Sequence, residues 1–346
     1  MIFRNITEVI GNTPLVEVKN HFALSGASAQ ILLKLEWFNM GGSTKDRIAL
    51  NMVKEAEKNG ALRPGMTIIE SSSGNTAIGL AIVAAQRGYR FVAICDRHLP
   101  IGKRNRLLAL GAQIVFIPPT PEGMDTVEIR IALARKLAAR IKGCATLEQY
   151  GNKANVAAHY AGTGAEILMD TAGQLDACVI FCGTCGSVSG IGQALKERNP
   201  QIRVIAVEPE GSAIFGGQLK PYLIAGGGLS FVPSILDRKV VDEVHRVSDL
   251  EAFRMSRELA GVQGIMVGSS GGGVAHVAMK LAASCGPGKR IVGVIPDIGD
   301  RYIDSLFDDE WLRAHGLQES ILQRTADHEL VAAAMAEGCN VNAIER

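Results

Sequence analysis

The feature that most constrains this chain is a regular alternation of short runs rich in Val and Ile with longer segments of helical period. Strand candidates span residues 31–35, 67–70, 91–95, 113–117, 177–181, 204–207 and 291–295. Helical segments such as 48–59, 76–87, 128–141 and 252–260 fall between them. Strands that alternate with helices are typical of parallel sheets covered by helices. The sequence therefore predicts an α/β fold.

The chain is longer than one hydrophobic core usually organises. Its 346 residues predict about two domains around a shared cleft. Because no internal repeat or low-complexity linker is present, we expect one domain to be inserted in the other. We predict a large domain from residues 1–40 and 146–316, a smaller mobile domain from 41–145, and a helical C-terminal tail from 317–346.

The charge balance excludes several classes of protein. Lys and Arg number 36 against 35 Asp and Glu, so neither nucleic acid nor an anionic membrane is an expected partner. Apolar stretches end well before the roughly 20 residues that span a bilayer. The first residues lack the features of a secretory signal. We expect a cytoplasmic protein.

The seven cysteines are irregularly spaced, which suits reduced thiols better than a disulfide framework. Only Cys182 and Cys185 form a close pair. That spacing could indicate redox or metal chemistry, but no second pair or histidine cluster completes a metal site. We therefore expect no metal.

A lysine stands in the first of several Gly- and Ser-rich segments at strand-to-helix junctions. Lys45 lies in residues 41–47, at the start of a helix, where its side chain could project into a cleft. The spacing of a P-loop is absent. A surface lysine at a helix start is the plainer alternative.

Two further segments carry hydroxyl and amide groups at predicted helix starts. Residues 71–76, Ser-Ser-Ser-Gly-Asn-Thr, could bind a carboxylate at the positive end of a helix, although Ser and Asn also cap helices without any ligand. Residues 183–187, Gly-Thr-Cys-Gly-Ser, favour a phosphate. Their glycines do not match the dinucleotide fingerprint. Residues 268–273 are interpreted as a flexible entry loop to a helix over 274–281.

In this combination and order, the segments resemble the cysteine synthase and cystathionine β-synthase group of fold type II pyridoxal-phosphate enzymes. The resemblance runs from Gly-Asn-Thr-Pro-Leu-Val at 11–16 to Pro-Asp-Ile-Gly-Asp-Arg-Tyr at 296–302. It implies pyridoxal 5'-phosphate as cofactor, amino acids as substrates, and a homodimer. The fold it implies has two domains with mainly parallel twisted sheets flanked by helices.

The resemblance also implies roles for single residues. Lys45 resembles the lysine that holds the cofactor as a Schiff base, and Asn75 the amide that binds its phenolic oxygen. Ser270 resembles the hydroxyl that faces the pyridine nitrogen. Cys185 stands where many members have Gly. The phosphate-binding group comprises Gly183, Thr184, Cys185, Gly186 and Ser187, and the clamp for the substrate carboxylate comprises Ser72, Ser73, Thr76 and Gln149.

This set of residues implies β-replacement on an O-activated serine, because a neutral Ser270 does not hold the pyridine nitrogen protonated. Lys45 would also act as the general base. Finer marks at Ser71, Asp96, 211–216, 299–304 and 309–312 resemble members that join O-phospho-L-serine to L-glutamate.

Two alternatives stay open. One is a cysteine synthase that uses sulfide with O-acetylserine or O-phosphoserine, which the glycines at 226–228 favour. The other is a catalytically silent member, against which Lys45 and Asn75 argue. Glutamate would need cations near the mouth of the site, or else the basic residues there form a solvated helix face. The candidates are Arg97, His98, Lys103 and Arg104.

Overall fold

The computed structural model describes residues 2–18, 29–97, 99–121 and 126–317. The predicted tail lies outside these residues, except for Leu317. Among the described residues, no helix combines the length and the apolar character needed to cross a membrane.

The larger sheet has six strands in the order β1-β2-β10-β7-β8-β9. All neighbouring strands are parallel except β1, which runs antiparallel to β2. Because the strands are parallel, the carboxyl ends of β7 and β10 lie side by side, with Ile180 opposite Val294. The strands are β1 (Leu15–Val18), β2 (Gln30–Leu35), β7 (Ala177–Phe181), β8 (Arg203–Pro209), β9 (Glu243–Val247) and β10 (Arg290–Ile295).

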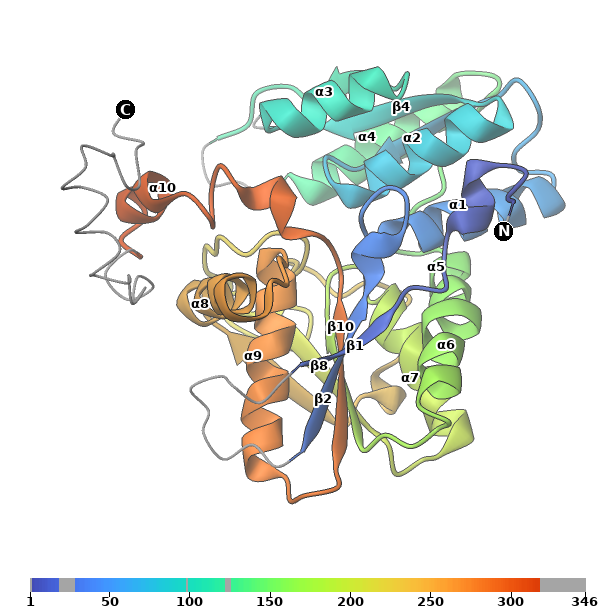
Figure 1. The fold of residues 1–346 in the computed structure, drawn as a ribbon. Coiled ribbons are helices and arrows are strands. Elements are labelled where there is room, and N and C mark those ends of the chain that lie inside the picture. The colour runs from blue at the N-terminus through green and yellow to red at the C-terminus, as the bar shows by residue number, and fades with distance from the viewer. Residues whose placement is uncertain (1, 19–28, 98, 122–125, 318–346) are drawn as a thin grey trace.

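Helices cover both faces of this sheet. On one face, α8 (Asp249–Glu258) and α9 (Ser269–Ser284) pack on a core that includes Val179. On the other, α6 (Ala165–Asp170) and α7 (Gly186–Arg198) pack on a core that includes Ile180 (Figure 1). Since successive side chains of a strand point to opposite faces, both faces need apolar residues. That requirement explains the continuous apolar runs of the central strands.

A second sheet, between β2 and β7 in the chain, has four parallel strands in the order β5-β4-β3-β6. Figure 1 shows it with its helices above the larger sheet. The α/β fold with mainly parallel sheets flanked by helices is thus confirmed. These elements are α1 (Lys45–Lys58), β3 (Thr67–Ser71), α2 (Asn75–Arg87), β4 (Arg90–Cys95), α3 (Ile101–Ala109), β5 (Gln113–Phe116), α4 (Val127–Arg140) and β6 (Cys144–Ala145), followed by α5 (Lys153–Ala158) and, near the end, α10 (Asp309–Ala314).

The prediction for residues 268–273 was wrong. They form no flexible loop, because α9 begins at Ser269 and runs through the glycines. A Cβ atom on Gly271 would lie 2.9 Å from the Ile295 side chain, and one on Gly273 would lie 2.8 Å from Phe181. The glycines therefore serve close packing of the helix on the sheet, which outweighs their low helix propensity.

A buried ion network fixes the start of α1 against the larger sheet. The Arg47 Nε atom donates to Glu36 at 2.6 Å, and its Nη1 atom donates to Glu166 of α6 at 2.6 Å. Lys34, fully buried in β2, lies 3.1 Å from Glu166. Burial by itself would lower the pKa of Arg47, but Glu36 and Glu166 raise it. The network thereby fixes Lys45, two residues before Arg47.

We expect Arg47→Gln to lower the free energy of unfolding by about 3–5 kcal/mol, because it leaves the buried Glu36 without its charge partner. The matched control is Arg135→Gln, which removes an exposed guanidinium paired with Glu148 and should cost about 0–1 kcal/mol. Urea denaturation of both variants measures the difference. Equal losses would show that the buried network contributes no more than a surface pair.

Candidate active site

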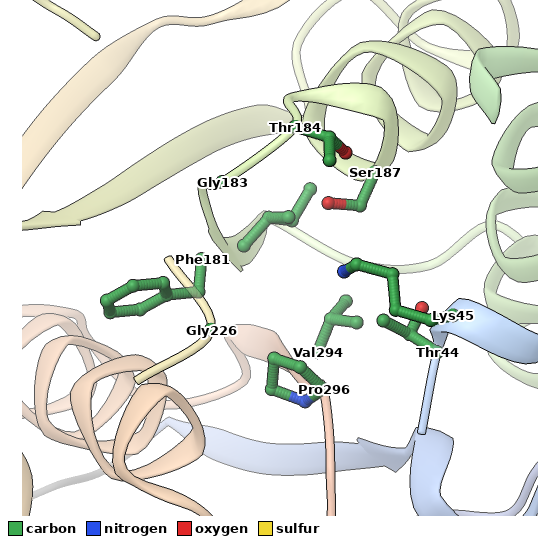
Figure 2. A pocket seen from close by; sticks show the side chains of 10 residues that line it. Thr44, Lys45, Phe181, Gly183, Thr184, Ser187, Gly226, Val294 and Pro296 are labelled. Carbon is green, nitrogen blue, oxygen red and sulfur yellow. The ribbon is translucent and has the colours of Figure 1, made fainter. Parts of the chain in front are cut away.

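Lys45 projects from the first turn of α1 into a small cavity at an edge of the larger sheet. Figure 2 shows its amine between Ser187 and Val294. The cavity lies at the carboxyl ends of β7 and β10, the edge at which ligands bind in open α/β sheets. Its lining comprises Thr44, Lys45, Ile180, Phe181, Gly183, Thr184, Ser187, Gly226, Val294 and Pro296.

The surroundings of Lys45 favour its neutral form. Burial lowers the pKa of this amine, while the carboxylates of Asp297 and Glu36 act in the opposite direction. A lysine with a lowered pKa keeps a larger fraction of free amine near neutral pH, and free amine is the nucleophilic and basic form.

The segment 183–187 forms a turn at the start of α7. Cys185 adopts a left-handed conformation, with φ of 65°, and the helix begins at Gly186. The Thr184 hydroxyl accepts from Asn155 Nδ2 at 3.1 Å and from Gly186 N at 3.4 Å, so its own hydrogen stays available to a ligand. The first N–H groups of a helix also lack intrahelical acceptors. The turn can thus hold a phosphate with neutral donors.

The cavity wall contains a further polar group, the hydroxyl of Thr44. The Thr44 hydroxyl oxygen is buried and makes no hydrogen bond with the residues that the structure describes. Together with the amine of Lys45 and the donors of 183–187, it gives a set that fits a phosphate-bearing aldehyde such as pyridoxal phosphate. Lys45 would hold the aldehyde carbon, and Thr184 and Ser187 the phosphate.

Asn75 is held in one orientation by residues that follow β10. Its Nδ2 atom donates to Asp297 at 2.8 Å, and its Oδ1 atom accepts from Arg301. Tyr302 donates to the same Asp297 oxygen at 2.6 Å. We did not predict Asp297 as a site residue. The available signal was its position directly after β10, at the carboxyl end of a central strand.

The predicted carboxylate clamp comes together at the end of β3. Thr76 donates to Gln149 Oε1 at 2.7 Å, and Gln149 Nε2 donates to the carbonyl of Ser71 at 2.9 Å. Ser72 accepts from Ala77 N at 3.1 Å, whereas the N-cap residue of α2 is Gly74, so neither Ser nor Asn occupies the capping position itself. The role of these residues as a clamp stays a prediction.

Glu70 holds the turn that carries Gln149. Its carboxylate accepts from the backbone N–H groups of Leu147 at 3.1 Å, Glu148 at 2.9 Å and Gln149 at 3.4 Å. Burial raises the pKa of Glu70 to about 7, although these donors oppose the shift. No local pattern in the sequence indicates this supporting role, because the donors are 77–79 residues away in the chain.

Ser270 lies in the first turn of α9 and is buried. Its hydroxyl lies close to the cavity wall, because a Cβ atom on Gly226 would lie 3.8 Å from Ser270 Oγ and Gly226 lines the cavity. The contact of Ser270 with a pyridine nitrogen stays a prediction.

Cys182 and Cys185 are buried free thiols. The Cys182 thiol lies 3.7 Å from the carbonyl of Ile180, and the Cys185 thiol lies 3.5 Å from that of Gly183. Burial raises the pKa of Cys182 well above its usual value, which disfavours the reactive thiolate. In the part of the chain that the structure describes, no cluster of His, Cys, Asp or Glu could hold a metal ion.

Comparison with known proteins identifies the enzyme class to which this fold and cavity belong. Residues 6–297 match the family described as pyridoxal-phosphate dependent enzyme. The chain is 39% identical over 324 residues to cystathionine beta-synthase of Oryctolagus cuniculus, covering 92% of this chain and 59% of that protein. It is 38% identical over 310 residues to a cysteine synthase of Staphylococcus aureus, covering 88% and 98%.

A solved structure of O-ureido-L-serine synthase has a TM-score of 0.85 and 35% identity, covering 96% of this chain and 100% of that one. The chain thus belongs to the pyridoxal-phosphate dependent enzyme family, among its cysteine synthase and cystathionine β-synthase-like members. It spans about three fifths of the length of the cystathionine beta-synthase from Oryctolagus cuniculus.

We expect the purified protein to be yellow, with absorption near roughly 410–420 nm from cofactor linked to Lys45. Borohydride should fix the cofactor covalently, and peptide mapping should find it on Lys45. Lys45→Ala should lose the covalent label, while Lys103→Gln, which removes another amine near Asp297, should keep it. A label on any other lysine would contradict the assignment.

Proposed function

We propose that this chain catalyses β-replacement on an O-activated L-serine. In the leading form, O-phospho-L-serine and L-glutamate give N-(2-amino-2-carboxyethyl)-L-glutamate and phosphate. This is the reaction of the synthase of that name in staphyloferrin B biosynthesis, a step towards 2,3-diaminopropionate. The position of Lys45 beside the turn at 183–187 is the observation that carries the proposal.

The cofactor, when bound, supplies the electron sink that allows loss of the substituent from the β-carbon. The chain supplies the base and the binding groups. The neutral amine of Lys45 takes the proton from the α-carbon, a role that its lowered pKa supports. Gln149 and the helix start at Thr76 bind the substrate carboxylate, and closure of the smaller domain (41–145) then excludes water.

Arg130 supports a phosphorylated first substrate. Its guanidinium is buried, donates to Ser73 at 3.0 Å, and lies 3.7 Å from Asp96. The Arg130 guanidinium therefore lies beside the loop 71–76 that would bind the amino acid, and its carboxylate partner, Asp96, is 3.7 Å away. Arginine binds phosphate through parallel N–H donors, and the neutral acetyl group of O-acetylserine needs no such charge.

The choice of glutamate over sulfide rests on the finer marks in the sequence, at Ser71, Asp96, 211–216, 299–304 and 309–312. The alternative is a cysteine synthase, which the similarity to almost the whole length of the Staphylococcus aureus enzyme favours. Both reactions use Lys45 in the same way, so the nucleophile distinguishes them. A cytoplasmic homodimer is also proposed, on the family resemblance and the composition.

We expect enzyme given O-phospho-L-serine to release phosphate at least about tenfold faster with L-glutamate than with sulfide, a difference of about 1.4 kcal/mol in activation free energy. Mass spectrometry of the products, with O-acetylserine and other amines tested in parallel, identifies both substrates. Efficient cysteine formation without a glutamate adduct would overturn the leading form in favour of cysteine synthase.

We expect Arg130→Gln to lower kcat/KM for O-phosphoserine about 10–100-fold more than for O-acetylserine, because a charge-assisted contact to phosphate is lost. The comparison of two donors within one variant separates this effect from general damage to the loop. Arg140→Gln, an exposed residue of the same helix, is the control. A parallel loss with both donors would indicate that Arg130 only supports Ser73.

A further inference from the structure

Four basic side chains lie near Gly41, Ser73 or Asp297, and three of them have polar partners. Arg301 donates to Asn75 and to the carbonyl of Gly41. Arg106 donates to the same carbonyl at 3.0 Å, and Arg130 donates to Ser73. Lys103, in the first turn of α3, is the fourth. Its ammonium lies 5.7 Å from the centre of the Tyr302 ring and forms neither a hydrogen bond nor an ion pair with any residue that the structure describes.

Burial and nearby charges distinguish Lys103 from the other basic residues that the sequence predicts near the mouth of the site. Arg97 and Arg104 are exposed, and His98 lies outside the described residues. Lys103 is partly buried, and the charges of Asp297, Arg301 and Asp96 act on the pKa of its amine. The plainer interpretation, a solvated helix face, thus describes Arg97 and Arg104 but not Lys103.

Lys103 lies near three charged side chains, those of Asp297, Arg301 and Asp96, and the first two have polar atoms without a hydrogen-bond partner among the described residues. Burial and the nearby guanidinium of Arg301 lower the pKa of the amine, while Asp297 and Asp96 oppose the shift. The Nε atom of Arg301 is also buried without a hydrogen-bond partner among the described residues. In the Asp297 carboxylate, the Oδ2 atom already accepts from Tyr302 and Asn75, whereas the Oδ1 atom is buried without a hydrogen-bond partner among the described residues. Unpaired donors such as the Lys103 ammonium and the Arg301 Nε atom are stabilised by an anion.

We infer that Lys103, supported by Arg301, binds a carboxylate of the second substrate. The inference rests on the proposed function and specifies where an amino-acid nucleophile is held. Such a nucleophile brings carboxylates that must be neutralised beside the cofactor, whereas sulfide brings none. Arg130 donates to Ser73 and lies 3.7 Å from Asp96, and it is assigned to the phosphate of the first substrate. The carboxylate of the second substrate and the phosphate of the first are thus bound by different cations, Lys103 and Arg130.

The test compares Lys103→Gln with Arg104→Gln, which removes the same charge from the next, exposed position of the helix. We expect Lys103→Gln to raise KM for glutamate at least about tenfold, with KM for sulfide and the O-phosphoserine to O-acetylserine preference within about twofold of the original enzyme. Lys103→Arg should restore most of the affinity. Arg104→Gln should change none of these values.

Calorimetric titration with glutarate, a dicarboxylate without an amine, separates this inference from the proposed function. If the enzyme forms no glutamate adduct but binds glutarate through Lys103, the carboxylate site stands and the proposed nucleophile is wrong. If it forms the adduct and Lys103→Gln leaves KM for glutamate unchanged, the site is wrong and the function stands. A loss of preference for O-phosphoserine in Lys103→Gln would assign the residue to the phosphate instead and overturn the inference.

Discussion

Arg47 carries a buried positive charge between two carboxylates that come from distant parts of the chain, Glu36 after β2 and Glu166 in α6. Each charge would be costly to bury alone, so the three groups stabilise one another only when the start of α1 lies against the larger sheet. Lys45 is two residues earlier in the same helix. The cavity below it therefore depends on this network for its shape, and the reactive amine depends on it for its position.

The parallel strands bring together groups of the site that are far apart in the sequence. The carboxyl ends of β7 and β10 are neighbours, so the turn at 183–187 and the residues after Ile295 face the same cavity. Asn75, at the start of the helix that follows β3 in the other sheet, donates to Asp297. The turn at 183–187 offers neutral donors to the cavity, whereas the cations Lys103 and Arg130 do not line it.

Local patterns predicted the parts of this site that one short segment can specify. Lys45 at a helix start and the turn at 183–187 are recognisable because their chemistry and their backbone geometry lie within a few residues. Residues 268–273 misled the same reasoning. Their glycines are needed where α9 meets Phe181 and Ile295, and a contact between a helix and a sheet leaves no local signal that distinguishes it from flexibility.

By itself the sequence determined the α/β class and the order of most strands and helices, because periodicity is a local property. Only the tertiary structure decided which charges are paired. It placed Glu70 under the turn of Gln149, fixed Asn75 between Asp297 and Arg301, and left Lys103 without a polar partner among the described residues. Such pairings join residues dozens to hundreds of positions apart, and they depend on burial and distance, which no local pattern contains.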